Sequence, residues 1–420
     1  MTGKLLNDCF LHDRDRMRHT EVLALLRDRL SCVTDHESVA LCTALGRVAH
    51  ADVQSTYAIP QADNAAVDGF AIRHSDLTAS DGPLPIHASH PAGAEPPDVP
   101  NGYAVRIFTG AVMPPGLDTV AMSEDCTVEG DVVTLPVALK VGANRRERGE
   151  DVMPGDVILT ANHVVTPAHI AALAACGCAS VAVRAQLRVA ILSTGNEIIP
   201  PGSPAAAHEV YDANRPMLAA LLQHPSIATT DLGHVPDDEP GLRAILAKAA
   251  ASHDVIVTTG GASRGDEDHM LTALDTLGNR HLWQIAIKPG RPMMFGQIGD
   301  CVVLGLPGNP VAAFVCTLLY ARHAMARLMG ISPRGPRPIM APAGFEIASK
   351  KPDRREFLRG WIGDDGTAQK FARDGSGLIS GLRAAGGLIE LPEDVTSVQR
   401  GDPVRYLRLS DFQIAHEDQP

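Results

Sequence analysis

Between residues 187 and 330 the sequence alternates apolar, β-branched runs with helical segments, and this alternation restricts the fold more than any other feature. Strands that alternate with helices pack as right-handed βαβ units around a mostly parallel sheet. The sequence therefore predicts a central three-layer α/β domain over residues 187–333. The expected strands are LRVAILST, IATTDLGHV, DVIVTTGG, WQIAIKPG and CVVLGLPG, and the expected helices cover 216–223, 241–251, 268–277 and 310–329.

One of these strands runs into the loop DVIVTTGGASRGDED, residues 254–268. Ligands of open α/β sheets bind beyond the carboxyl ends of the strands. Gly260 and Gly261 allow the backbone to approach a phosphate, and the carboxylates Asp266, Glu267 and Asp268 are hard oxygen donors suited to Mg²⁺. The loop predicts a phosphate and metal site; an ordinary Gly-rich turn whose acids cap the next helix is the alternative.

Acidic residues also follow two other strands of the same sheet. Glu197 in STGNE, Asp237 in HVPDDE and Asp268 are expected to converge at one sheet edge. Three carboxylates in one place repel each other unless a cation binds, so we expect a divalent metal there. The alternative is that some of them cap helices, as Asp237 or Asp238 could.

Two further loops at this edge suit anions. In LPGNP, Pro310 stands where a long helix begins, which leaves free N–H groups directed at the cleft. In IKPGRP, Lys288 and Arg291 flank a Pro-Gly turn and suit phosphate or molybdate-like oxyanions. The sequence contains neither a nucleophilic triad order nor an HExxH zinc motif.

The flanking regions predict three smaller units. Residues 1–50 and 141–186 are expected to form an α+β linking domain, with helices at 20–30 (Thr20 as N-cap) and 38–45 and a third helix starting at Thr166-Pro167. Residues 51–140 read as a small β domain with a hairpin turn at Glu129-Gly130-Asp131. Residues 334–420 read as a second, C-terminal β domain.

Charge and composition narrow the function classes. The net charge of −12 argues against broad binding of nucleic acid or acidic membrane surfaces. The N-terminus has no signal-peptide core and no apolar run approaches membrane-spanning length, so we expect a cytoplasmic protein. The eight cysteines show no metal-ligand spacing and predict free thiols.

Nine motifs, in order, resemble the molybdopterin molybdenumtransferase family, which includes the bacterial MoeA proteins and the gephyrin E domain. The resemblance covers nearly the whole chain. The motifs are ALGRVAHADV, PQADNAAVDGFA, RIFTGAVMPPGLDTV, NRRERGED, ILSTGNE, YDANRPML, TTGGASRGDED, IKPGRPMMFG and GLPGNPVAAFV.

This resemblance implies an elongated homodimer of four-domain subunits, with a dimerising linking domain and a β-barrel-like C-terminal domain. The implied reaction converts adenylylated molybdopterin and molybdate into molybdenum cofactor and AMP with the help of Mg²⁺. A separate molybdopterin adenylyltransferase would supply the substrate, and cofactor-modifying enzymes or molybdoenzymes would accept the product. The implied catalytic residues are Asp68, Asp151, Glu197, Asp237, Asp268 and Lys288, with Glu197, Asp237 and Asp268 as metal ligands; the implied substrate-binding residues are Thr109, Gly260, Gly261, Arg291, Pro307, Pro310, Arg359 and Ser376.

The chain departs from the family pattern at several positions. The departures leave two alternatives open: a non-catalytic dimeric scaffold or cofactor-delivery protein of the same fold, and the related adenylyltransferase. The acids disfavour the scaffold, and the flanking domains disfavour the adenylyltransferase. The departures are Ala65, Val67, Phe70, Asn196, Arg264 and Gln284.

Overall fold

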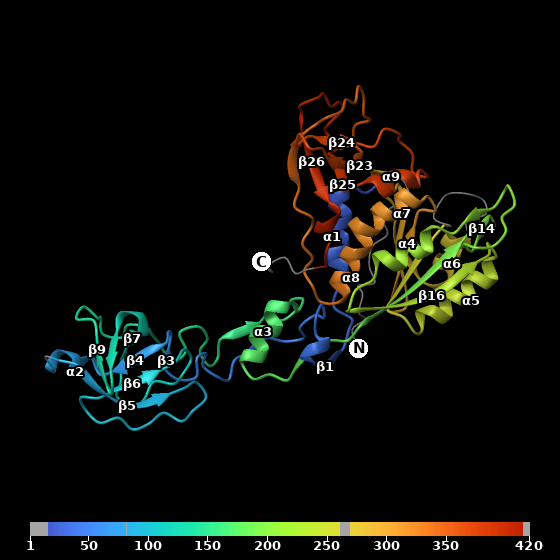
Figure 1. Cartoon of the computed structure of the whole chain (residues 1–420). Helices are drawn as coiled ribbons and strands as arrows, with labels where there is room; N and C mark the ends of the chain where they lie inside the picture. Colours follow the sequence, from blue (N-terminus) through green and yellow to red (C-terminus); the bar gives the residue numbers. More distant parts are fainter. Residues whose placement is uncertain (1–15, 81, 261–268, 415–420) are drawn as a thin grey trace.

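The computed structural model describes residues 16–80, 82–260 and 269–414, and it is a mixed α/β protein with several separate sheets. Figure 1 shows three regions: an arm at one end, the α/β region at the other, and a C-terminal β region packed above it. The arm holds β1 to β12, the α/β region holds β13 to β21 except β19, and the C-terminal region holds β22 to β26.

A six-stranded sheet forms the centre of the α/β region, in the order β16-β13-β17-β21-β20-β18. The first four strands are parallel, and β20 and β18 are antiparallel at the far edge. The expected mostly parallel sheet is confirmed, although the sequence reading missed β20. The strands are β13 (Leu187–Thr194), β16 (Ile227–Val235), β17 (Val255–Thr259), β18 (Asn279–Gln284), β20 (Pro292–Ile298) and β21 (Cys301–Leu306).

Helices cover both faces of this sheet. Alternate residues of β13 face opposite sides: Val189 packs in the core with α4, α7 and α8, and Ala190 packs in the core with α5 and α6. This period-2 alternation is what a sheet buried on both faces requires. The helices are α4 (Asn214–Leu221), α5 (Glu239–Ala250), α6 (His269–Leu277), α7 (Pro310–Cys316) and α8 (Arg322–Leu328), with a π-helical turn at Thr317–Ala321 between the last two.

The continuous helix Pro310–Leu328 is long and apolar enough, by length and composition, to cross a membrane. However, 78% of its most apolar window is buried inside the protein, where it packs in the largest core. Its apolar character therefore matches a core helix.

The C-terminal strands form a second six-stranded sheet, which also takes up a piece of the α/β region. Ile287 and Lys288 pair in parallel with β23, so the expected single strand WQIAIKPG is wrong: it divides after Gln284. The elements are β19 (Ile287–Lys288), β22 (Ile339–Pro342), β23 (Arg355–Ile362), β24 (Ala368–Lys370), β25 (Gly387–Leu391), β26 (Pro403–Arg408), α9 (Ile379–Ala384) and a 3-10 turn at Leu409–Asp411.

The outer part of the arm contains a sheet in the order β7-β4-β6-β5-β9-β8, with its own apolar cores. The expected hairpin at Glu129-Gly130-Asp131 is confirmed, and Gly130 supplies the positive φ of 62° that its turn needs. The elements are β3 (Asn64–Ala65), β4 (Gly69–Ile72), α2 (His74–Ala79), β5 (Leu84–His90), β6 (Ala104–Ile107), β7 (Thr119–Met122), a 3-10 turn (Ser123–Asp125), β8 (Thr127–Glu129), β9 (Val132–Thr134) and β10 (Arg145–Arg146), which pairs with β3.

The inner part of the arm joins it to the α/β region. The helix expected at 38–45 is wrong, because His36–Ala40 forms β1 and pairs antiparallel with β12. Thr166 caps α3 as expected, and its hydroxyl accepts a bond from the His169 N–H. The elements are β1 (His36–Ala40), a 3-10 turn (Leu41–Thr43), β2 (Val53–Gln54), β11 (Val157–Leu159), α3 (Pro167–Ala175) and β12 (Ser180–Arg184).

The first described helix, α1 (His19–Arg29), packs against α8 although it is distant in sequence (Figure 1). Thr20 is not its N-cap, as expected from the sequence; the cap is Arg18. The Glu21 carboxylate accepts a bond from the Arg18 N–H at 2.7 Å, which starts the first turn two residues earlier than expected.

Candidate functional site

Two adjoining cavities lie where the parallel strands of the α/β region end against the C-terminal region. They measure about 570 Å³ and about 440 Å³ and share Pro292, Pro307 and Asn309 in their walls. We call the first the acidic chamber, because Glu197, Asp212 and Asp237 line it, and the second the cationic chamber, because Lys288, Arg291, Arg354 and Arg359 line it. Together they form one cleft.

The acidic chamber brings together two of the three acids expected to converge. Glu197 follows β13 and Asp237 follows β16, and both line this cavity. The exposed Glu197 carboxylate has no hydrogen-bond or ion-pair partner within residues 16–80, 82–260 and 269–414. Asn196, one of the departures from the family pattern, joins the two loops because its Oδ1 accepts a bond from the Asp237 N–H at 3.1 Å. Asp268, Gly261 and Arg264 lie outside the described residues.

A third acid, Asp212, was not predicted from the sequence. It is only 3% exposed, and it accepts bonds from the Ser193 hydroxyl at 2.6 Å and from the Arg215 N–H and Nε at 3.0 and 2.9 Å. Arg215 also donates to Asp231, at 2.6 Å for the shorter contact. Burial by itself raises the pKa of Asp212, but the bonds from Arg215 and Ser193 outweigh it and hold that pKa below its ordinary value. Asp212 is therefore an ionised anchor whose lone pairs are taken.

Asn214 organises the floor of the acidic chamber. Its Nδ2 donates to Thr259 Oγ1 at 2.7 Å and to the Gly308 carbonyl at 2.6 Å, while the Thr259 hydroxyl donates to the Pro307 carbonyl at 3.2 Å. The start of α4, the end of β17 and the LPGNP loop are thus tied together. These bonds fix the loop from which α7 begins at Pro310.

Gly260, the last described residue of the loop after β17, also lines this chamber. Its φ is +90°, and a Cβ at this position would collide with the carbonyl of Thr194. Only glycine fits without strain, so the backbone here lies open to the cavity.

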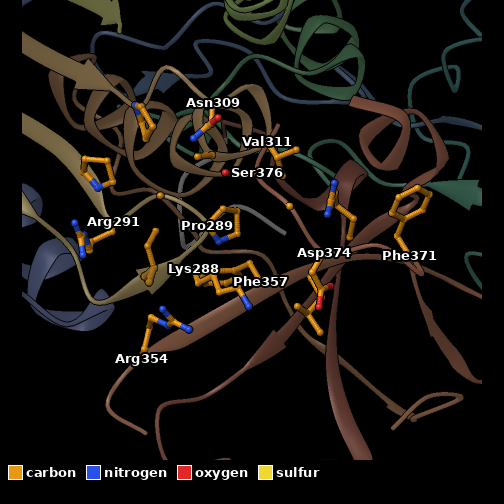
Figure 2. Close-up of a pocket in the computed structure, with 18 residues that line it drawn as sticks. Lys288, Pro289, Arg291, Asn309, Val311, Arg354, Phe357, Phe371, Asp374 and Ser376 are labelled. Carbon is orange, nitrogen blue, oxygen red and sulfur yellow. The ribbon is translucent and has the colours of Figure 1, made fainter. Parts of the chain in front are cut away.

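The cationic chamber is shown in Figure 2, with Lys288, Arg291 and Arg354 on one side and Asp374 and Phe371 on the other. Lys288 Nζ lies 3.2 Å from one carboxylate oxygen of Glu356, and Arg354 lies 2.8 Å from the other. Glu356 is 5% exposed and so offsets both cations from beneath. Arg291 is exposed and makes no ion pair in the part of the chain that the structure describes, which leaves its guanidinium available to an anion.

Arg359 holds the chain that crosses between the chambers. Its Nη1 donates to the Leu378 carbonyl at 2.9 Å, its Nη2 donates to the Arg373 carbonyl at 3.1 Å, and the guanidinium lies over the Phe371 ring. Burial lowers the pKa of Arg359. Within the segment it holds, the Ser376 carbonyl accepts a bond from the Val311 N–H at 3.0 Å.

Three of the predicted site residues lie elsewhere, on the arm. Asp68 and Thr109 adjoin each other: the Asp68 carboxylate accepts the Thr109 N–H at 2.8 Å and its hydroxyl at 2.7 Å, which lowers the pKa of Asp68. Asp151 is exposed on the loop after β10. Figure 1 places this part of the arm at the opposite end of the molecule from the cleft, so one chain does not bring the two sets together.

Comparison with known proteins places the chain among proteins of one kind. Residues 17–177 match the MoeA N-terminal region (domain I and II), residues 190–327 match a probable molybdopterin binding domain, and residues 341–409 match the MoeA C-terminal region (domain IV). A molybdopterin molybdenumtransferase from Haemophilus influenzae is 34% identical over 90% of this chain and 95% of its own length. One from Nostoc sp. is 32% identical over 91% and 90%.

The fold is also similar to solved structures. A molybdopterin biosynthesis MoeA protein from Pyrococcus horikoshii OT3 superposes with a TM-score of 0.81 at 30% identity, over 94% of this chain and all of the other. A molybdenum cofactor biosynthesis protein from Pyrococcus furiosus gives a TM-score of 0.59 at 22% identity, which is evidence of fold alone.

Proposed function

Because this chain belongs to the molybdopterin molybdenumtransferase family, we propose that its acidic chamber holds a divalent cation and the phosphates of adenylylated molybdopterin. The chain is a transferase of molybdenum cofactor biosynthesis that inserts molybdate into molybdopterin. The observation that carries the proposal is that Glu197 and Asp237 line one cavity at the carboxyl edge of the sheet. The names of the relatives do not favour the scaffold alternative.

The residues of the acidic chamber fit Mg²⁺. Mg²⁺ is commonly held by one or two carboxylates together with substrate phosphates. Glu197 and Asp237 supply two carboxylates, and Asp212 is excluded as a ligand because Ser193 and Arg215 occupy its oxygens. We assign Asp268 to the same site on the resemblance. When bound, Mg²⁺ polarises the phosphate at which the anhydride is cleaved.

The remaining residues of the cleft orient the substrates. The open backbone at Gly260 and the N-terminus of the helix that begins at Pro310 receive phosphate oxygens, because unpaired N–H groups there favour anions. Arg291 provides a free cation for an oxyanion on the cationic side, and Lys288 a partly offset one. Arg359 and Ser376 position the segment of the C-terminal region that closes the cleft.

We further propose a homodimer in which the arm of one subunit completes the cleft of the other. Asp68, Thr109 and Asp151 would then meet the molybdate or the pterin in the partner's cleft. Support comes from their exposure and from their separation from the cleft in one chain (Figure 1). Apolar side chains exposed on the inner arm suit a protein interface: Leu45, Tyr57, Met153 and Val157.

The wider setting follows from the same reaction. We propose that a separate adenylyltransferase supplies the substrate, that molybdoenzymes or cofactor-modifying enzymes accept the product, and that the protein works in the cytoplasm. The four-part division at residues 1–50 with 141–186, 51–140, 187–333 and 334–420 is also proposed; separate apolar cores support it.

The test is direct. Purified protein is incubated with adenylylated molybdopterin, Mg²⁺ and molybdate, and AMP is quantified by chromatography. AMP release that depends on molybdate and stops with a chelator is expected. Release at the same rate without a divalent cation would contradict the metal site.

A further inference from the structure

Three apolar side chains are exposed at the mouth of the acidic chamber, which is otherwise polar. Val210 is 57% exposed, Tyr211 46% and Ile379 50%, and all three line the cavity. Exposed apolar groups gathered around a polar cavity are typical of a site that binds the apolar part of a ligand. We call these three residues the apolar lips.

The lip residues of the α/β region are held in place by the chain around them. Val210 and Tyr211 form β15, which pairs with β14 (Ile198–Ile199) above the cleft. The Tyr211 hydroxyl donates to the Ser203 carbonyl at 2.8 Å, which fixes the ring. The next residue is the anchor Asp212, whose N–H donates to Ile199 and whose carboxylate is bonded to Ser193.

The lip from the C-terminal region is anchored as well. Ile379 is the first residue of α9 and directly follows Leu378, whose carbonyl accepts a bond from Arg359. Both lips therefore stand on fixed segments, and a ligand bound between them orders little of the chain. Such preorganisation improves affinity.

We propose that the apolar lips bind the adenine ring of the adenylyl group, with the Tyr211 ring as the stacking face. This rests on the proposed function and names the substrate part that this mouth recognises. The Tyr211 hydroxyl is already used by Ser203, so the lips offer faces rather than hydrogen bonds. That suits a flat base, which binds aromatic rings by stacking.

The opposite end of the cleft suits the other half of the substrate. A pterin carries several hydrogen-bonding groups on its edge and needs polar partners. The cationic chamber supplies these through Arg291, Asp374 and the backbone around Ser376. The anhydride between the two halves then lies near Pro307 and Asn309, which both chambers share.

Calorimetric titration with AMP and with ribose 5-phosphate, both with Mg²⁺, tests the lips. Tyr211→Ala is expected to weaken AMP binding about tenfold and to leave ribose 5-phosphate binding unchanged, because only AMP carries the base. Tyr211→Phe keeps the ring and should bind AMP as the wild type does. Tyr103→Ala is the matched control, since Tyr103 is 37% exposed on the arm.

Two results would overturn the proposal: Tyr211→Ala binding AMP as tightly as wild type, or losing affinity equally for AMP and ribose 5-phosphate. The second result would mean that the tyrosine supports the phosphate site instead. Wild-type AMP release from adenylylated molybdopterin is measured alongside. If it persists while Tyr211→Ala binds AMP normally, only the lips fail; if the wild type releases no AMP, the proposed function fails too.

Discussion

The acids of the cleft and the acids of the arm stand in different surroundings. Those of the cleft come from separate strand ends and are joined by a network in which Asn214, Asn196 and Asp212 fix the loops. On the arm, Asp68 is held only by its neighbour in space, Thr109, and both are exposed.

This difference teaches how the work is divided. The cleft is a preorganised site with its own anchors, and it contains the groups suited to a metal and phosphates. The arm presents a small polar patch that has no cavity of its own among those found beside the described residues. The patch acquires a role only where another surface meets it, which is why the comparison can be broken by experiment.

Glu197→Gln should give the largest effect. The substitution keeps the shape but removes a carboxylate that has no partner in the described part of the chain, so molybdate-dependent AMP release should fall about 1,000-fold with little change in stability. Glu209→Gln, on the same flap but bonded to the Ala206 N–H, is the control and should stay within about twofold. Full activity of Glu197→Gln would remove it from the metal site.

Asp68→Asn should come next, with a loss of about 100-fold in AMP release and an unchanged melting temperature. The reason is that its exposed carboxylate supports no core and is proposed to act in the partner's cleft. Glu129→Gln, at the tip of an arm hairpin, provides the comparison. An active Asp68→Asn would mean that the arm patch takes no part in the reaction.

Asp212→Asn should affect stability more than its distance from the metal would suggest. Arg215 and Ser193 lose a buried ionised partner, so the free energy of unfolding at pH 7 should fall by about 1–3 kcal/mol. The folded pKa of Asp212 lies below its ordinary value of 3.8, so its contribution is present above that pH and is lost as pH falls through the lower folded value. Urea unfolding of both proteins from pH 7 to pH 3 should therefore converge; a constant gap would contradict the anchor.

Thr109→Val should have the smallest effect. The backbone N–H bond to Asp68 is the larger cause of its lowered pKa and remains, while the hydroxyl bond is lost. The pKa of Asp68 should rise part of the way toward 3.8, as followed by NMR titration of the carboxyl carbon. An unchanged titration would show that the hydroxyl does not hold the carboxylate.

The sequence predicts local structure well where the pattern is local. The apolar runs of β13 and β17 and the cap at Thr166 are found where they are expected. It fails where a distant strand decides: Val39 pairs with Val181, so a segment with helical spacing becomes β1. The antiparallel strand β20 was missed for the same reason.

The site shows the same limit. That Glu197 and Asp237 face one cavity follows from strand ends meeting at one edge. The pairing of Lys288 with Glu356, 68 positions away, cannot be read from local sequence. Asp212 and Tyr211 were missed although YDANRP carried a signal, an acid and an amide just before a helix start.

The most direct measurement mixes two inactive variants. Asp68→Asn and Glu197→Gln proteins are unfolded and refolded together in equal amounts, and AMP release from adenylylated molybdopterin is measured. If the arm of one subunit completes the cleft of its partner, mixed dimers contain one intact site, and roughly a quarter of wild-type activity should return. A mixture as inactive as either variant alone would contradict the shared site.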